Sequence, residues 1–177
     1  MSQELLLLPR RKGYCSAKVR HLIDVKFNQN ENRLEKIYDE YKVIADRIPN
    51  LLTNAGKDYF HAQDYTNNAA GGVGANFIAL TESTITPAVG DTTLSGEITT
   101  NGLARVIAGT RTHTAASNTT TLSQTFTASG SFTSVLASAL FNASSSGTMA
   151  HEANFASGSG ALVSGDQLVV TWTMTLS

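Results

Sequence analysis

The C-terminal end of the chain alternates between large apolar side chains and small polar ones. Every second position is apolar, and most positions between them are threonine: Leu168, Val170, Trp172, Met174 and Leu176 alternate with Val169, Thr171, Thr173 and Thr175. Successive side chains of a strand point to opposite faces of a sheet, so this pattern predicts a strand with one apolar and one threonine face. The turn-forming residues Ser164-Gly165-Asp166 precede it.

Further strands are predicted before this one. Short apolar or threonine-rich runs are separated by Gly, Pro and Asn, and they span residues 76–81, 102–114, 119–128, 132–141 and 148–155. In one of them Leu122 and Phe126 share a face and are expected in the core. No helical crossover of sufficient length separates these runs, which argues against a parallel sheet. The expected fold is mainly β, with an antiparallel β-sandwich (jelly-roll or Ig-like) over residues 76–177.

The composition changes near Pro49. Residues 1–50 contain ten Lys and Arg against seven Asp and Glu, whereas residues 51–177 contain three against seven. The second part also contains 22 Thr and 15 Ser. We therefore expect an N-terminal part that differs in structure from the β domain.

Residues 1–30 are predicted to form an extended basic N-terminal arm. A leucine run closed by Pro9 is followed by a cluster of cationic side chains; the residues expected to contact a partner are Leu5, Leu6, Leu7, Leu8, Arg10, Arg11, Lys12, Lys18 and Arg20. The leucine run is far shorter than the roughly 20 apolar residues that cross a bilayer, so no membrane contact is expected. Basic residues follow the run rather than precede it, which does not fit a secretory signal.

Residues 31–49 are predicted to form one amphipathic helix. Apolar side chains recur at spacings of three and four residues, at Leu34, Ile37, Tyr41, Ile44 and Ile48. This stripe can pack on the helix's own domain or against a helix of another subunit. Residues 50–75 are then expected to contain a short helix and a glycine-rich connection.

The sequence contains no motif that predicts catalysis, a metal site or a cofactor. His151-Glu152 begins like a zinc-protease motif, but Phe155 stands where the second histidine is required, and His151 is interpreted as a loop or strand-surface residue. The glycines at 71–74 lack the Gly-Lys-Ser/Thr of a phosphate-binding loop. Cys15 is the single cysteine, which excludes an intramolecular disulfide. We expect a protein that is not an enzyme and has no cofactor.

The charged and aromatic residues favour protein partners. The basic cluster is short and has Tyr14 as its only aromatic residue, so an acidic protein surface is favoured over nucleic acid as its partner. Carbohydrate recognition usually needs exposed aromatic platforms, and aromatic residues make up only 7% of the chain. A carbohydrate- or receptor-binding module stays open as an alternative.

Several sequence segments after Pro49 resemble the Ser/Thr-rich β-sandwich of virion structural proteins of tailed bacteriophages. The resemblance covers roughly residues 50–177 and lies in turn and strand segments at 51–58, 96–105, 139–143, 147–152 and 164–173. These segments contain no catalytic residues. Residues 1–49 match no family pattern.

The resemblance implies a non-enzymatic virion protein assembled in the host cytoplasm. A capsid decoration (cement) protein attached by its arm is preferred, and a neck or tail-tube component is the alternative. A carbohydrate- or receptor-binding module on a fibre is the second alternative. The implied partners are the major capsid, portal, neck or tail subunits, together with further copies of the chain in a trimer or hexamer.

Overall fold

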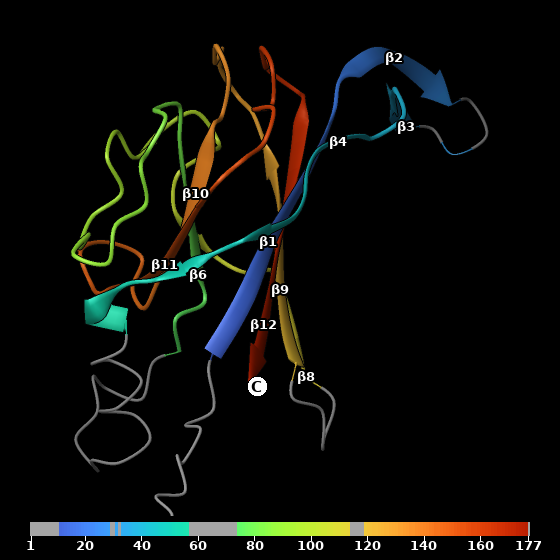
Figure 1. Cartoon of the computed structure of the whole chain (residues 1–177). Coiled ribbons are helices and arrows are strands. Elements are labelled where there is room, and N and C mark those ends of the chain that lie inside the picture. The colour runs from blue at the N-terminus through green and yellow to red at the C-terminus, as the bar shows by residue number, and fades with distance from the viewer. Residues whose placement is uncertain (1–10, 29–30, 32, 57–73, 114–118, 177) are drawn as a thin grey trace, which may run out of the picture.

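The computed structural model describes residues 11–28, 31, 33–56, 74–113 and 119–176, and its regular secondary structure consists almost entirely of antiparallel strands (Figure 1). One five-stranded sheet, here called sheet A, has the order β4-β1-β12-β9-β8. A second five-stranded sheet, sheet C, has the order β5-β11-β10-β6-β7. The two sheets pack face to face, which is the architecture of a β-sandwich.

The strands of sheet A come from both ends of the chain. Their bounds are β1 (Arg11–Arg20), β4 (Lys42–Pro49), β8 (Thr110–His113), β9 (Thr119–Thr127) and β12 (Gln167–Leu176). Sheet C contains β5 (Leu51–Leu52), β6 (Phe77–Thr81), β7 (Val106–Ile107), β10 (Ala137–Phe141) and β11 (Met149–Asn154). The strands predicted within residues 76–177 are therefore present, with the run at 102–114 divided into β7 and β8.

The predicted N-terminal arm is wrong for the residues that the structure describes. Arg11–Arg20 forms β1, which lies between β4 and β12 and pairs along its full length with β12. Small or apolar side chains at every second position of β1 are buried in the core: Gly13, Cys15, Ala17 and Val19. Lys18 and Arg20 alternate with these on the outer face, because a strand reverses its side chains at each residue.

The predicted amphipathic helix at 31–49 is also wrong. The segment forms β3 (Arg33–Tyr38) and β4, with a short connection at 39–41. Ile44 is buried in the core and Ile48 packs against it, whereas the Leu34 side chain is 69% exposed. Pairing of β4 with β1 therefore overrides the three-four spacing.

Residues 50–75 begin differently from the prediction as well. Leu51–Leu52 is strand β5, and residues 54–56 are helical up to the end of this described stretch. The remainder of that predicted helix and the glycines at 71–73 lie outside the described residues.

The main core fills the space between sheets A and C. Leu122, Phe126, Leu168, Val170 and Trp172 are all buried there, as their period-2 pattern predicts. Met174 is partly buried against the same core, and the side chain of Leu176 lies outside the described part. A smaller core lies on the other face of sheet C, where Ile85 and Leu94 of the 82–105 connection cover that sheet.

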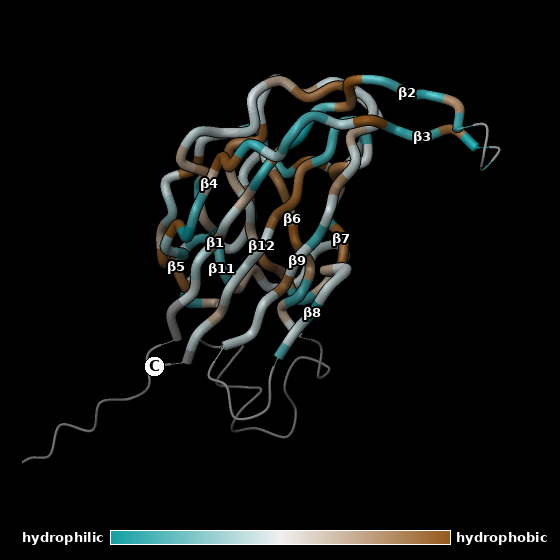
Figure 2. The backbone as a smooth tube through the Cα atoms, turned by 90° about the vertical axis from the view of Figure 1, so that its right-hand side faces the viewer, coloured by the Kyte–Doolittle hydropathy of each residue, from teal (hydrophilic) through white to brown (hydrophobic). Residues whose placement is uncertain are grey.

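A two-stranded hairpin extends from one end of the sandwich (Figures 1 and 2). It consists of β2 (Leu22–Asn28) and β3, which pair only with each other among the described residues. The chain enters it from β1 and leaves it into β4, so the hairpin continues a pair of neighbouring strands of sheet A. It contributes no residue to either core.

The Trp172 side chain gives a test of the core. It is fully buried, and its Nε1 donates a hydrogen bond of 3.2 Å to Oγ of the buried Ser138 on the opposite sheet. Trp172→Phe removes this bond and leaves a small void, so we expect a loss of roughly 1–3 kcal/mol in the free energy of unfolding. The control Thr173→Ala, on the outer face, should change it by less than about 0.5 kcal/mol. Urea denaturation followed by circular dichroism measures both, and equal effects would contradict the described core.

Candidate functional site

The β2–β3 hairpin has one mainly apolar face, which also carries Lys36, and one mainly polar face. Its register places Phe27 opposite Leu34 and Val25 opposite Lys36. Residues directly opposite in an antiparallel pair share a face, so Val25, Phe27 and Leu34 lie together. The residues between them along β2, Asp24 and Lys26, lie on the other face.

The apolar face is exposed to solvent. The exposed fractions are 45% for Val25, 55% for Phe27 and 69% for Leu34, and Ile23 at the start of the hairpin is 64% exposed. These are four of the eight large apolar side chains that are exposed in the described part of the chain. Exposed apolar groups gathered on one element indicate a contact surface more strongly than isolated ones do.

The polar face carries balanced charges that pair within the hairpin. Lys26 Nζ lies 3.8 Å from a carboxylate oxygen of Asp24, and Arg33 lies 3.8 Å from Glu35. Asn28 Nδ2 donates to Glu35 Oε1 at 2.7 Å. All these charged side chains are substantially exposed, so each ion pair contributes little to stability. These side chains determine the pattern of charge on the polar face of the hairpin.

A buried carboxylate stabilises the root of the hairpin, which is the place where its two strands leave the sandwich. Asp166, at the start of β12, accepts hydrogen bonds from Val163 N at 2.9 Å and Leu22 N at 2.9 Å. Its Oδ2 also lies 2.7 Å from His21 Nδ1. Burial opposes ionisation of Asp166, but these hydrogen bonds and the His21 charge lower its pKa below the usual value. The carboxylate therefore joins the first residues of the hairpin to the last strand of the sandwich.

Two tyrosine rings lie beside an arginine side chain at the same root. The Arg20 guanidinium lies 4.1 Å from the ring centroid of Tyr38 and 4.6 Å from that of Tyr41. Its Nη2 donates to Gln167 Oε1 at 2.8 Å. Across the root, Asp39 N donates to His21 O at 3.0 Å. These contacts join β1, both ends of the hairpin and β12, so the hairpin has a fixed base.

The predicted arm residues fall into three groups. Leu5, Leu6, Leu7, Leu8 and Arg10 lie outside the described residues, and Arg11 and Lys12 are in β1 with side chains that are not described. Arg20 belongs to the root, and Lys18 Nζ lies 4.2 Å from the Tyr41 ring centroid. The basic residues do not form an extended arm where the structure describes them.

The predicted helix residues also divide. Ile44 and Ile48 belong to the sandwich, Ile37 and Tyr41 are half-buried, and Leu34 lies on the exposed hairpin face. The sequence prediction missed Ile23, Val25 and Phe27. Their alternation with Asp24 and Lys26 is a period-2 signal that could have identified β2.

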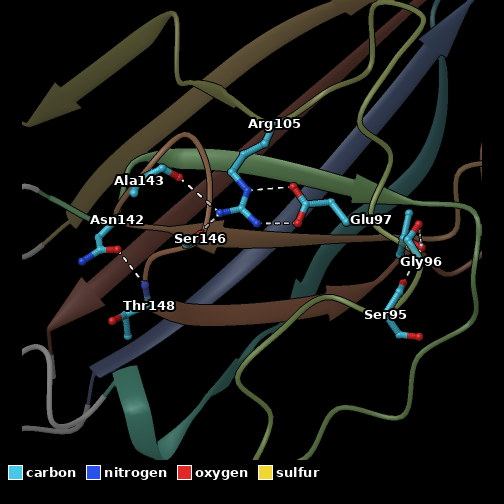
Figure 3. Close-up of polar contacts among 9 residues, drawn as sticks. Ser95, Gly96, Glu97, Arg105, Asn142, Ala143, Ser146 and Thr148 are labelled. Atoms are coloured by element: carbon cyan, nitrogen blue, oxygen red, sulfur yellow. Dashed lines mark hydrogen bonds and ion pairs between the residues drawn. The ribbon is translucent and has the colours of Figure 1, made fainter.

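A second polar cluster joins two connections beside sheet C (Figure 3). Arg105 donates two hydrogen bonds to the Glu97 carboxylate, one of them from Nε at 2.7 Å, and a third to the carbonyl oxygen of Ser146 at 2.7 Å. The guanidinium also lies 3.5 Å from the ring centroid of Phe141. All of these donors have protein acceptors, so the cluster is interpreted as a structural clamp between the connections at 97–105 and 142–148.

Strand β11 carries two buried ionisable residues on opposite faces. His151 faces the sandwich interior, with its ring 6.3 Å from that of Trp172, which corrects the predicted surface position. Glu152 lies under the connection that covers sheet C, where Ala88 N donates to it at 3.1 Å. Burial, together with a hydrogen bond to Asp91 and repulsion from it, raises the pKa of Glu152 to about 7.

The described residues hold no group of three or more His, Cys, Asp or Glu side chains placed to bind a metal. Burial raises the pKa of the Cys15 thiol, so this residue is unreactive. A shallow depression of about 130 Å³ lies over β1 and β4, beside Lys18 and Asp46. It is smaller than the roughly 300–1,000 Å³ of small-molecule sites. The hairpin and its root are therefore the candidate functional site.

The root gives a prediction for Asp166. Asp166→Asn leaves one side-chain acceptor oxygen where the carboxylate has two, so a backbone amide at the root loses its partner. We expect a loss of about 1–3 kcal/mol in the free energy of unfolding near neutral pH. The lowered pKa of Asp166 stabilises the native state above the unfolded value of about 4 and loses this effect as the pH falls through the folded value. Urea titrations between pH 2 and 7 should therefore show a smaller acid loss in the variant, and an unchanged acid loss would contradict the described root.

Glu152 gives the opposite pH dependence. Its raised pKa means that its stabilising effect is complete below the unfolded value of about 4.5 and is lost as the pH rises through about 7. We expect the unfolding free energy of the wild type to fall by about 1–2 kcal/mol between pH 5 and 8. This is less than the full pKa shift implies, because Asp91 on the covering connection is partly exposed to solvent. Glu152→Gln should flatten this dependence, and Asp91→Asn should reduce it. Denaturation followed by fluorescence of the single tryptophan measures it, and equal slopes in all three proteins would exclude the Glu152 assignment.

Within the described residues, no helix has the length and apolar character needed to cross a bilayer. Comparison with known proteins gives no match: no family model, no curated protein and no solved structure is similar to this chain. The candidate site therefore rests on the geometry of the hairpin and its root.

Proposed function

We propose that the chain is a non-enzymatic structural protein of a tailed-bacteriophage virion, of the capsid decoration type, and that the β2–β3 hairpin attaches it to the particle. The observation that carries this proposal is the hairpin itself, which extends from the sandwich with an exposed apolar face and a fixed root. Such an element can enter a groove of a neighbouring subunit without any change in the sandwich. The phage assignment rests on the resemblance of residues 50–177.

The hairpin takes the place of the arm in this mechanism. Fixing its root before binding reduces the conformational entropy that is lost when the apolar face becomes ordered against a partner. The face is small, so a single contact is weak, and repeated attachment over a symmetric particle would supply avidity. The Thr-rich outer face of sheet A is then directed away from the contact and remains hydrated.

A neck or tail-tube role uses the same attachment but differs in copy number. Quantitative mass spectrometry of purified particles counts the chain relative to the major shell protein. Hundreds of copies favour decoration, or a tail tube where the count follows tail length, whereas roughly six or twelve indicate a neck ring. Absence from the particle overturns the virion proposal and favours the carbohydrate- or receptor-binding alternative.

Deleting the hairpin tests the attachment. Residues 23–37 are replaced by Asn-Gly, which joins Leu22 to Tyr38, a pair that already lies opposite in the hairpin. The root contacts and both cores are retained, so we expect the melting temperature to change by only a few degrees. The number of copies on purified particles should fall at least tenfold.

A matched pair of triple variants separates the apolar face from general loss of apolar surface. Val25→Ser, Phe27→Ser and Leu34→Ser together should reduce attachment as the deletion does. Val89→Ser, Ile107→Ser and Val163→Ser remove three other exposed apolar side chains and should leave attachment unchanged. Full attachment of the deletion variant, or equal losses in the two triples, would refute the hairpin as the attachment element.

A further inference from the structure

The sandwich protects the edges of both of its sheets. In sheet C the edge strands β5 and β7 contain two residues each. In sheet A, β8 contains four residues, and β4 is interrupted by two register shifts against β1 and by a positive φ of 49° at Arg47. Short and irregular edges pair poorly with strands of another chain.

Strand β2 is longer than β5, β7 and β8, and its one register shift against β3 lies at its start, between Leu22 and Asp24. It has seven residues, and among the described strands only β3 pairs with it. In Figures 1 and 2, β2 lies along the upper side of the hairpin and β3 along the lower side. The amide of Val25, at its centre, donates to Oδ1 of the adjacent Asp24 side chain at 2.8 Å, a local bond that an incoming strand can replace. The outer edge of β2 is therefore open to a further strand.

We propose that this edge pairs with the same edge of a second copy of the chain, antiparallel and centred on Val25. A two-fold axis through this pair places Val25 opposite itself and residues of each copy opposite each other at equal distances from it. Asp24 then lies opposite Lys26 of the second copy, and Lys26 opposite its Asp24. Phe27 lies at each end of this regular ladder, beside the register shift at Ile23 of the second copy.

The sequence of β2 selects this register over its neighbours. Directly opposite side chains of an antiparallel pair share a face. Two identical strands related by a two-fold axis therefore keep their faces continuous only when one residue lies directly opposite its own copy. Centring on Asp24 or on Lys26 would place like charges opposite each other. Only the Val25 register puts opposite charges on the polar face and apolar side chains on the other.

Strand β3 does not offer the same solution. Centring a self-pair on Glu35 or Lys36, the middle of β3, places two like charges at the axis. Centring it on Leu34 places Arg33 opposite Glu35, but the ladder then contains only the first three residues of β3. Charge complementarity therefore points to β2, and the occupant it specifies is an identical β2. The resulting four-stranded sheet joins the two apolar faces into one continuous surface.

This inference deepens the proposed function and rests on the hairpin being the attachment element: two copies would present a doubled apolar platform to the particle. A ladder of seven residues a side buries much less than the roughly 1,200 Å² of stable complexes, so the isolated pair is expected to associate weakly. Assembly on a particle would supply the missing affinity through multiple contacts.

Charge exchange tests the register. Asp24→Lys and Lys26→Asp each place like charges opposite each other twice, so we expect at least a tenfold weaker dimer for either variant in sedimentation equilibrium of the full chain at low salt. The double exchange Asp24→Lys/Lys26→Asp restores complementarity, and so does an equimolar mixture of the two single variants. The control Asp46→Lys changes an exposed residue of β4 and should leave the dimer unchanged.

Cross-linking gives a second readout. Val25→Cys places two thiols at the axis, where opposite Cα atoms lie about 4.5–5.5 Å apart, within reach of a disulfide. Phe27→Cys is the matched control, because the two introduced thiols would lie roughly 13 Å apart. The native Cys15 is buried and does not compete. Oxidation should cross-link the first variant and leave the second monomeric on a denaturing gel.

The outcomes separate this inference from the proposed function. A wild-type chain that stays monomeric up to about millimolar concentration, or a dimer that none of the exchanges affects, overturns β2 pairing. If hairpin deletion nevertheless removes the chain from particles, the attachment proposal stands alone. If the wild type dimerises as described but the deletion variant still attaches to particles, the pairing stands and the attachment proposal fails.

Discussion

The pairing of β1 with β12 is the interaction on which the other elements depend. All ten residues of β1 have partners in β12, which joins residues 11–20 to residues 167–176. The two strands lie in the middle of sheet A and contribute Cys15, Val19, Leu168 and Trp172 to the core. Nearly the whole chain lies between them, so closing this contact has a large entropic cost that only the completed sandwich offsets. The root of the hairpin depends on the same pairing, because Asp166 directly precedes β12.

The last strand could be predicted from the sequence because one of its faces is buried and the other faces solvent. One face of β12 contacts the core and the other contacts water, so apolar residues and threonines alternate without interruption. Strand β9 shows a similar alternation. Strands β6, β10 and β11 are buried on both faces, and they were located by the Gly, Pro and Asn residues that separate the short runs. Strands β1 and β2 were harder to identify because their polar positions are filled by charged residues, which gave the segment the composition of an arm. The alternation of Gly13, Cys15, Ala17 and Val19 with Tyr14, Ser16 and Lys18 was nevertheless present, and small core residues made it less conspicuous than that of β12.

The segment predicted as a helix shows where local pattern and tertiary context disagree. Leu34, Ile37, Tyr41, Ile44 and Ile48 fit a helical stripe, yet they serve three different environments: the exposed hairpin face, the half-buried root and the core. Periodicity alone cannot separate one amphipathic helix from two strands joined at a sharp connection, because both place apolar residues at mixed spacings. The open position beside β1 decides in favour of the strand, since β4 supplies the hydrogen bonds that this edge of β1 requires. The candidate site could not be predicted for the same reason: the hairpin exists only because β4 returns to β1.

The hairpin is mechanically continuous with sheet A. Its two strands lead directly into β1 and β4, which are neighbours, and β1 is held on its other side by β12 along its full length. A force applied to the hairpin along its strands therefore acts on the whole β1–β12 ladder at once, because its hydrogen bonds share the load instead of opening one after another. The Asp166 carboxylate and the stacked Arg20 side chain resist bending at the root, where such a force enters the sandwich. If the hairpin attaches the chain as proposed, this arrangement would transmit the position of the partner to the entire domain.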